Sequence, residues 1–108
     1  MSTETIRHLN DAFRTGHTGT GRILVTQGVQ SLGADAVRRI LRQVMAFDAF
    51  TAGNDPHDEH DFGAFDHDGY RLFWKIDCYD HSLQYGSENP ADPRVTTRVL
   101  TIMLSSEY

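Results

Sequence analysis

Histidine and cysteine side chains in the middle of the chain are spaced like a set of metal ligands. His57 and His60 form a His-x-x-His pair, and Cys78 and His81 form a later Cys-x-x-His pair. Imidazole nitrogen and thiolate sulfur are ligands that zinc prefers, so these four residues are candidate zinc ligands. Alternation along a strand would place His60 and Cys78 on opposite faces, which weakens the hypothesis.

A second chemistry that these residue types permit is acid–base catalysis. Glu59, His60 and Asp61 are consecutive, and Asp77 follows in the next apolar segment. A histidine oriented by a carboxylate is the usual general base. The sequence contains neither a Gly-x-Ser-x-Gly nucleophile motif nor a cofactor fingerprint. We therefore expect no cofactor and favour a non-enzymatic role, with a small hydrolase centred on His60, Asp61 and Asp77 as the alternative.

The charge distribution suggests a third possibility, an acidic interaction surface. Residues 48–80 carry nine acidic side chains against Arg71 and Lys75, a net charge of −7, while the whole chain carries −5. Phosphates would be repelled, so direct binding of nucleic acid is not expected, whereas a basic protein surface would be attracted. The candidate contact residues are Asp55, Asp58, Glu59, Asp66, Asp68 and Asp80. A solvated acidic face without a partner is the alternative.

The chain as a whole has the size and composition of one folded domain. It has 108 residues, of which 39% are hydrophobic, and we expect one domain over residues 1–108. The sequence has no apolar run long enough to span a membrane and no signal-peptide pattern at its start. Cys78 is its only cysteine, so an internal disulfide is excluded and a reducing, cytoplasmic compartment is expected. The oligomeric state stays open.

The N-terminal half predicts helices around a short strand. Apolar residues recur at helical spacing over residues 3–14 and again over residues 34–47. Residues 15–22 are rich in Gly and Thr and predict a loop, which leads into an apolar strand at residues 23–26.

A β-hairpin is predicted to position the candidate site. Asp68-Gly69 is a strong two-residue turn signal between strands at residues 62–67 and 70–79. This register places Gly63 opposite Trp74, where it leaves room for the indole. Continued outward, it places Asp61 opposite Ile76, near the core, and His60 opposite Asp77.

The last segment permits two interpretations. Asp92-Pro93 resembles the start of a helix, and this favours a helix over residues 95–108. The β-branched residues between Val95 and Ile102 favour a strand instead. With residues 82–94 as a loop, the sequence predicts an α+β domain with an antiparallel sheet of about three strands, packed against two or three helices.

Three blocks of sequence resemble a family of small bacterial proteins known as a domain of unknown function. The blocks are NDPHDEHDFGAF at 54–65, FWKIDCYD at 73–80 and DPRVTTRVLTIMLSSEY at 92–108. The resemblance implies no established activity, but it implies a setting on plasmids, prophages and other mobile elements. The family pattern has aromatic residues at the positions of His57 and Cys78, which undermines the zinc set, while Glu59, His60 and Asp61 keep to the pattern.

Together these observations favour a small acidic binding protein that acts on a basic protein surface. The implied mobile-element setting suggests an anti-defence inhibitor, directed for example at restriction or CRISPR machinery. A small metal-dependent or acid–base hydrolase is the alternative.

Overall fold

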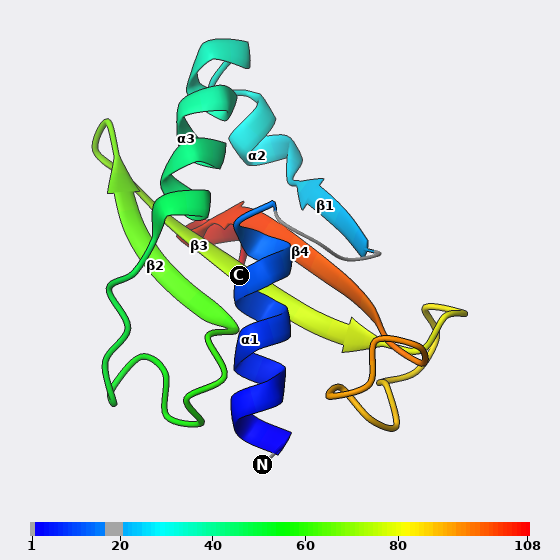
Figure 1. Ribbon diagram of the computed structural model, residues 1–108. Coiled ribbons are helices and arrows are strands. Elements are labelled where there is room, and N and C mark those ends of the chain that lie inside the picture. The colour runs from blue at the N-terminus through cyan, green and yellow to red at the C-terminus, as the bar shows by residue number, and fades with distance from the viewer. Residues whose placement is uncertain (1, 17–20) are drawn as a thin grey trace.

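The computed structural model describes residues 2–16 and 21–108 and has helices packed on one face of a four-stranded sheet (Figure 1). It confirms the predicted α+β class. The elements in chain order are α1 (Ser2–Arg14), β1 (Gly21–Val25), α2 (Gln27–Gln30), α3 (Ala34–Ala46), β2 (Phe62–His67), β3 (Tyr70–Tyr79), β4 (Thr97–Leu104) and the 3-10 helix η1 (Ser105–Glu107).

The sheet is mixed, with strand order β1-β4-β3-β2. Strand β3 is antiparallel to both β2 and β4, whereas β1 runs parallel to β4 at one edge. One face of the sheet packs against the helices to form the core. Its buried apolar side chains are Phe13, Val29, Ile40, Val44, Leu72, Trp74, Ile76, Leu100 and Ile102.

The two long helices form where apolar periodicity predicted them. In α3, Ile40 and Val44 are fully buried one turn apart, and the adjoining arginines face solvent. In α1, Phe13 joins the core, but Asn10 and Arg14 are buried as well. Helix α1 therefore presents polar groups as well as apolar ones to the rest of the protein.

The hairpin has the predicted register. Gly63 lies opposite Trp74, Asp66 opposite Arg71, and the turn is at Asp68 and Gly69. A Cβ atom at Gly63 would lie 2.3 Å from the indole Nε1 of Trp74. The largest core side chain thus occupies the space that the missing side chain of Gly63 leaves.

The helix favoured for residues 95–108 is wrong. Residues 97–104 form β4, which pairs with both β1 and β3. Asp92 instead closes a turn, in which its side chain accepts a hydrogen bond from Arg94 N and its carbonyl accepts one from Val95 N. The β-branched side chains that follow fit a strand with neighbours on both sides, and that tertiary pairing outweighs the helix-start signal.

The predicted pairing of His60 with Asp77 is also wrong. The backbone contact between the strands ends at Asp61, whose carbonyl accepts a hydrogen bond from Ile76 N at 2.9 Å. His60 has a φ of 54°, so the chain turns before it enters β2. This turn aims the imidazole toward α1.

Within residues 2–16 and 21–108, no helix is long and apolar enough to cross a membrane.

Candidate functional site

The segment before β2 folds into a tight loop around a buried carboxylate. Asp55 is only 6% exposed, and its side chain accepts hydrogen bonds from the backbone N–H of His60 at 3.2 and 3.4 Å. Asp58 and His60 both adopt left-handed backbone conformations, with φ of 56° and 54°. Such conformations are costly for residues other than glycine, and they persist where surrounding contacts impose them.

This loop forms one wall of a cavity of about 370 Å³, which we name the His60 pocket. The polar side chains of Asp55, Asp58 and His60 line it together with Phe50, Thr51, Ala52 and Pro56. Phe50 stacks flat on the His60 ring, with the two centroids 3.7 Å apart and an interplanar angle of 2°. The stacking fixes the plane of the imidazole.

Helix α1 fixes which nitrogen of His60 faces the pocket. The carboxylate oxygens of Asp11 lie 2.9 and 3.0 Å from His60 Nδ1. Because a carboxylate accepts hydrogen bonds, Nδ1 carries the hydrogen. The other nitrogen, Nε2, then points at Asp55 Oδ2 at 3.6 Å and at Asp58 Oδ1 at 3.9 Å.

Further side chains of α1 hold the loop in place. Arg7 donates hydrogen bonds to the carbonyl oxygen of Asp58 at 3.0 Å and to its carboxylate Oδ2 at 2.7 Å, which leaves Oδ1 on the pocket side. Asn10 donates to the carbonyl oxygen of Glu59 at 2.9 Å. Arg14 donates to Asp11 at 3.2 Å and lies over the Phe50 ring at 5.4 Å.

The pocket brings together three groups that could act as ligands for a cation. One ligand atom each from Asp55, Asp58 and His60 can be chosen so that all lie within 4.8 Å of one another. Two carboxylates that face a ring nitrogen favour positive charge at that nitrogen, which either a proton on Nε2 or a bound cation would supply. A divalent metal ion, or a cationic group of a partner, is the kind of ligand that this arrangement suits.

Comparison with known families shows which family the chain belongs to. Residues 25–107 match the model of DUF3768, a family described as a protein of unknown function. The chain belongs to this family. No curated protein and no solved structure compared with it gives a significant match. The DUF3768 region contains the loop of the His60 pocket, whereas Asp11 lies before that region, on α1.

The acid–base candidates occupy different places in this DUF3768 domain. Asp61 and Asp77 line a second cavity together with Lys75 and Tyr108, and Asp77 pairs with Lys75 at 2.9 Å. Burial raises the pKa of the Asp61 carboxyl, and the nearby carboxylates of Asp55 and Asp77 raise it further. Asp11, rather than Asp61 or Asp77, is therefore the carboxylate that orients His60.

Glu59 lies in the same loop but lines neither cavity. Its carbonyl binds Asn10, and burial followed by repulsion from Asp61 raises the pKa of its carboxyl. Glu59 therefore contributes to the contact between this loop and α1 through its backbone.

The zinc set is dispersed over the part of the chain that the structure covers. His57 is exposed and lines the second cavity, while the two ring nitrogens of His81 contact Thr97 Oγ1 at 2.9 Å and the carbonyl oxygen of Arg94 at 2.6 Å. Cys78 lies half-buried on β3, where burial raises the pKa of its thiol and Arg98 partly opposes the shift. His60 belongs to the group that could hold a metal ion, but with Asp55 and Asp58 as its companions.

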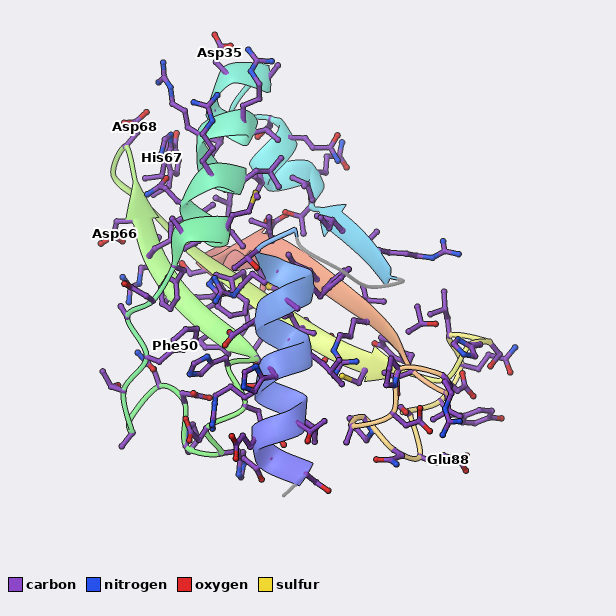
Figure 2. The ribbon with its side chains drawn as sticks, viewed as in Figure 1. Asp35, Phe50, Asp66, His67, Asp68 and Glu88 are labelled. Carbon is purple, nitrogen blue, oxygen red and sulfur yellow. The ribbon has the colours of Figure 1, made fainter. Side chains whose placement is uncertain are left out.

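The six acidic residues proposed for a contact surface lie in three regions. Asp55, Asp58 and Glu59 belong to the loop before β2, Asp66 and Asp68 stand at the tip of the hairpin (Figure 2), and Asp80 follows the opposite end of β3. Asp80 accepts hydrogen bonds from Ser82, Gln84 and Tyr85 within its own loop. The hairpin tip has two exposed acidic side chains close together, Asp66 and Asp68, while Asp58 in the loop before β2 is 69% exposed as well.

Asp11 belongs to the site, although no pattern in the sequence predicts it. It is separated from His60 by 49 positions, so local spacing carries no information about the contact. A signal existed in α1 itself, because polar residues at positions 7, 10, 11 and 14 make a stripe at helical spacing. Because the polar face of an amphipathic helix normally lies in solvent, such a stripe only names candidates for a polar contact.

Proposed function

We propose that the protein binds a divalent metal ion in the His60 pocket, with His60 Nε2, Asp55 Oδ2 and Asp58 Oδ1 as ligands. The observation that carries the proposal is the spacing around Nε2. A hydrogen-bonded histidine–carboxylate pair brings nitrogen and oxygen to about 2.8 Å. The separations here are 3.6 and 3.9 Å, closer to the roughly 3.4 Å between neighbouring ligands of a tetrahedral metal site with bonds of about 2.1 Å.

The contact between Asp11 and His60 supports the same proposal. Metal-binding histidines almost always donate their second ring N–H to a carboxylate or carbonyl, which fixes the tautomer and makes the bound nitrogen more basic. Asp11 stands in this position on Nδ1. Zinc and related first-row ions suit a set of one imidazole and two carboxylates.

The cavity leaves space beside such an ion. Three protein ligands and a pocket of about 370 Å³ leave room for a bound water or a small oxygen-containing ligand. A more specific form of this proposal is a metal-dependent hydrolase, because a metal ion with an open coordination position can activate a bound water. Its site would be built from His60, Asp55 and Asp58, with Asp11 as a positioning residue.

Calorimetric titration of the metal-free protein with Zn²⁺ and Mn²⁺ tests the proposal. We expect one ion per chain, and we expect His60→Ala to abolish binding. Asp11→Asn should weaken affinity by about 10- to 100-fold, the effect typical of residues that orient a ligand. Binding of the ion should also raise the unfolding midpoint of the wild type, because the ion binds the folded state.

His57→Ala is the matched control, because His57 lies in the same loop but outside the pocket lining. It should bind the ion like the wild type. Equal losses in His57→Ala and His60→Ala would mean that the ion binds loosely to exposed histidines, and this would contradict the proposal.

A second candidate function is binding of a basic protein partner, favoured by the projecting acids of the hairpin tip. The side chains of Asp66 and Asp68 are 69% and 75% exposed, and Tyr70 beside them is 48% exposed. Exposed carboxylates next to an aromatic ring suit an arginine-rich surface. A nucleic-acid-binding defence protein of a host is the kind of partner we propose, with these acids in place of phosphates.

Two double variants of equal charge change test this second candidate. Asp66→Asn/Asp68→Asn alters the hairpin tip, whereas Asp35→Asn/Glu88→Gln removes two exposed charges elsewhere (Figure 2). Fluorescence titration with an arginine-rich peptide should show about 10-fold weaker binding for the tip variant alone. Equal weakening of both would mean that only net charge matters, and would contradict a specific tip surface.

A further inference from the structure

Strand β1 ends in three consecutive apolar residues, Ile23, Leu24 and Val25, although it lies at the edge of the sheet and has a single charged residue, Arg22. Its residues Gly21–Val25 pair with β4 on one side, and among the described residues no strand pairs with its other side. Ile23 and Leu24 are 52% and 50% exposed although they point to opposite faces. Interior strands are apolar on both faces, whereas edge strands are usually protected by charges, proline or bulges.

The backbone of β1 also leaves a defined set of groups unpaired with β4. Thr26 N donates to the carbonyl oxygen of Ile102, so Thr26 faces β4. In a parallel ladder alternate residues turn their N–H and C=O to the same neighbour, so Leu24 also faces β4 and Ile23 faces outward. Ile23, at the centre of the strand, therefore presents both a donor and an acceptor.

An apolar groove accompanies this edge on the helix side of the sheet. It has a volume of about 630 Å³ and is lined by Ile23, Val25, Gln30, Ala34, Val37 and Arg38. Because Ile23 and Val25 share one face of β1, their side chains form the floor of the groove and α3 forms its wall. An apolar side chain beside Ile23 would lie in this groove.

We propose that this edge pairs with β1 of a second copy of the chain, antiparallel and with Ile23 of one copy opposite Ile23 of the other. The two central residues then exchange both backbone hydrogen bonds, as the outward groups of Ile23 require. The result is a two-fold dimer with a continuous eight-stranded sheet, which removes one exposed edge from each copy. This inference is independent of the metal proposal.

The side chains of β1 are compatible with such self-pairing at each position. A two-fold axis at Ile23 places Arg22 opposite Leu24 of the other copy, so the two arginines do not face each other. The aliphatic stem of Arg22 can cover the exposed Leu24, while its charged end reaches solvent. Gly21 lies opposite Val25, and the two Ile23 side chains meet in the grooves below α3.

The interface is small, so its stability should depend on concentration. Stable interfaces bury roughly 1,200–2,000 Å², whereas a strand of only five residues offers a smaller contact, the kind that suits a weak and reversible dimer. Sedimentation velocity over a concentration series should therefore move from the monomer mass toward twice that mass. A protein that stays monomeric up to about 1 mM, where even weak pairs associate, would overturn the proposal.

Ile23→Lys should abolish association, because it places two like charges next to each other in the groove. Ile23 is half exposed, so the variant should fold with an unchanged circular dichroism spectrum. Met45→Lys is the matched control: Met45 is 47% exposed near the far end of α3, and its replacement should leave association unchanged. A dimer that persists in folded Ile23→Lys would overturn the proposal.

Amide hydrogen exchange tests the geometry itself. The Leu24 amide, bonded to β4, should be protected at every concentration. The Ile23 amide should exchange quickly in dilute protein and at least 10-fold more slowly in concentrated protein. An Ile23 amide whose exchange does not change as the dimer forms would place the interface elsewhere and refute the pairing.

Discussion

At the scale of single residues, Glu107 shows how one exposed carboxylate can join two distant segments. Its Oε1 accepts hydrogen bonds from Thr26 Oγ1 at 2.6 Å and from Leu104 N at 2.8 Å, and its Oε2 accepts one from Gly28 N at 3.1 Å. These donors favour the charged form and lower the pKa of the carboxyl, with the Thr26 hydroxyl as the largest cause. Glu107 thereby fastens η1 to the start of α2.

The lowered pKa of Glu107 predicts a stability that is lost in acid. A carboxyl with a lower pKa in the folded state contributes stability above its unfolded pKa of about 4.3, and this contribution disappears as the pH falls through the folded value. In urea unfolding from pH 7 to pH 3, Glu107→Gln should be less stable than the wild type at pH 7, and the difference should shrink below about pH 4.

Glu88→Gln, which removes an exposed acid from the loop before β4, controls for the loss of one negative charge. A constant difference between wild type and Glu107→Gln over the whole pH range would contradict the role of the charged carboxylate.

At the scale of elements, the hairpin depends on the absence of a side chain at Gly63. A Cβ atom there would meet Trp74 Nε1 at 2.3 Å and Phe47 Cε1 at 2.9 Å, and both rings are packed against other rings. Gly63→Ala should therefore lower the free energy of unfolding by about 1–3 kcal/mol, the usual cost of an overpacked core. Urea unfolding, followed by the fluorescence of the single Trp74, measures the change.

Gly86→Ala is the control for this prediction, because a Cβ atom there meets nothing within 4 Å. Its stability should equal or slightly exceed that of the wild type. Equal effects of the two substitutions would mean that chain flexibility, and not the indole, explains the glycine at position 63.

The elements differ in how well local sequence predicts them. The Asp68-Gly69 turn and the alternation around it determine the β2–β3 register, and the apolar stripe of α3 predicts that helix almost to its ends. For β4, a local helix-start signal competes with β-branched residues, and its two neighbours in the sheet decide the outcome. Those neighbours lie far away in the sequence.

The candidate site was predictable only in part, because some of its contacts also join residues that lie far apart in the sequence. The sequence indicates Glu59, His60 and Asp61 as candidate residues, and of these His60 lines the pocket. The positive φ of His60 could not be read from the sequence, since it follows from the contacts with Asp11 and Phe50. The backbone contact between the strands ends at Asp61, so alternation continued beyond Asp61 gives Asp77 as the partner of His60, which is wrong.

At the scale of the whole molecule, Asn10 joins three parts of the fold. It is 1% exposed, donates to the carbonyl oxygen of Glu59 at 2.9 Å and accepts from Arg98 Nε of β4 at 2.8 Å. Asn10→Leu would leave a buried carbonyl and a buried guanidinium each without one partner. We expect a loss of about 2–4 kcal/mol in the free energy of unfolding, measured by urea denaturation.

Gln84→Leu, at an exposed position of the loop after β3, is the control for this change from polar to apolar. A loss below about 0.5 kcal/mol in Asn10→Leu would mean that α1 is held by its apolar contacts alone. The same result would also mean that the hydrogen bonds of Asn10 orient the loop of the His60 pocket without stabilising the fold.

The sheet order has a consequence for synthesis on the ribosome. Strand β4 is made last among the strands, yet it lies between β1 and β3 and pairs with both. A growing chain that ends before residue 97 therefore has β1 and its helices on one side and the hairpin on the other, with no strand to join them. Folding must wait until Leu104 has emerged, so nascent chains that stop short of β4 should be cut readily by proteases and bound by chaperones.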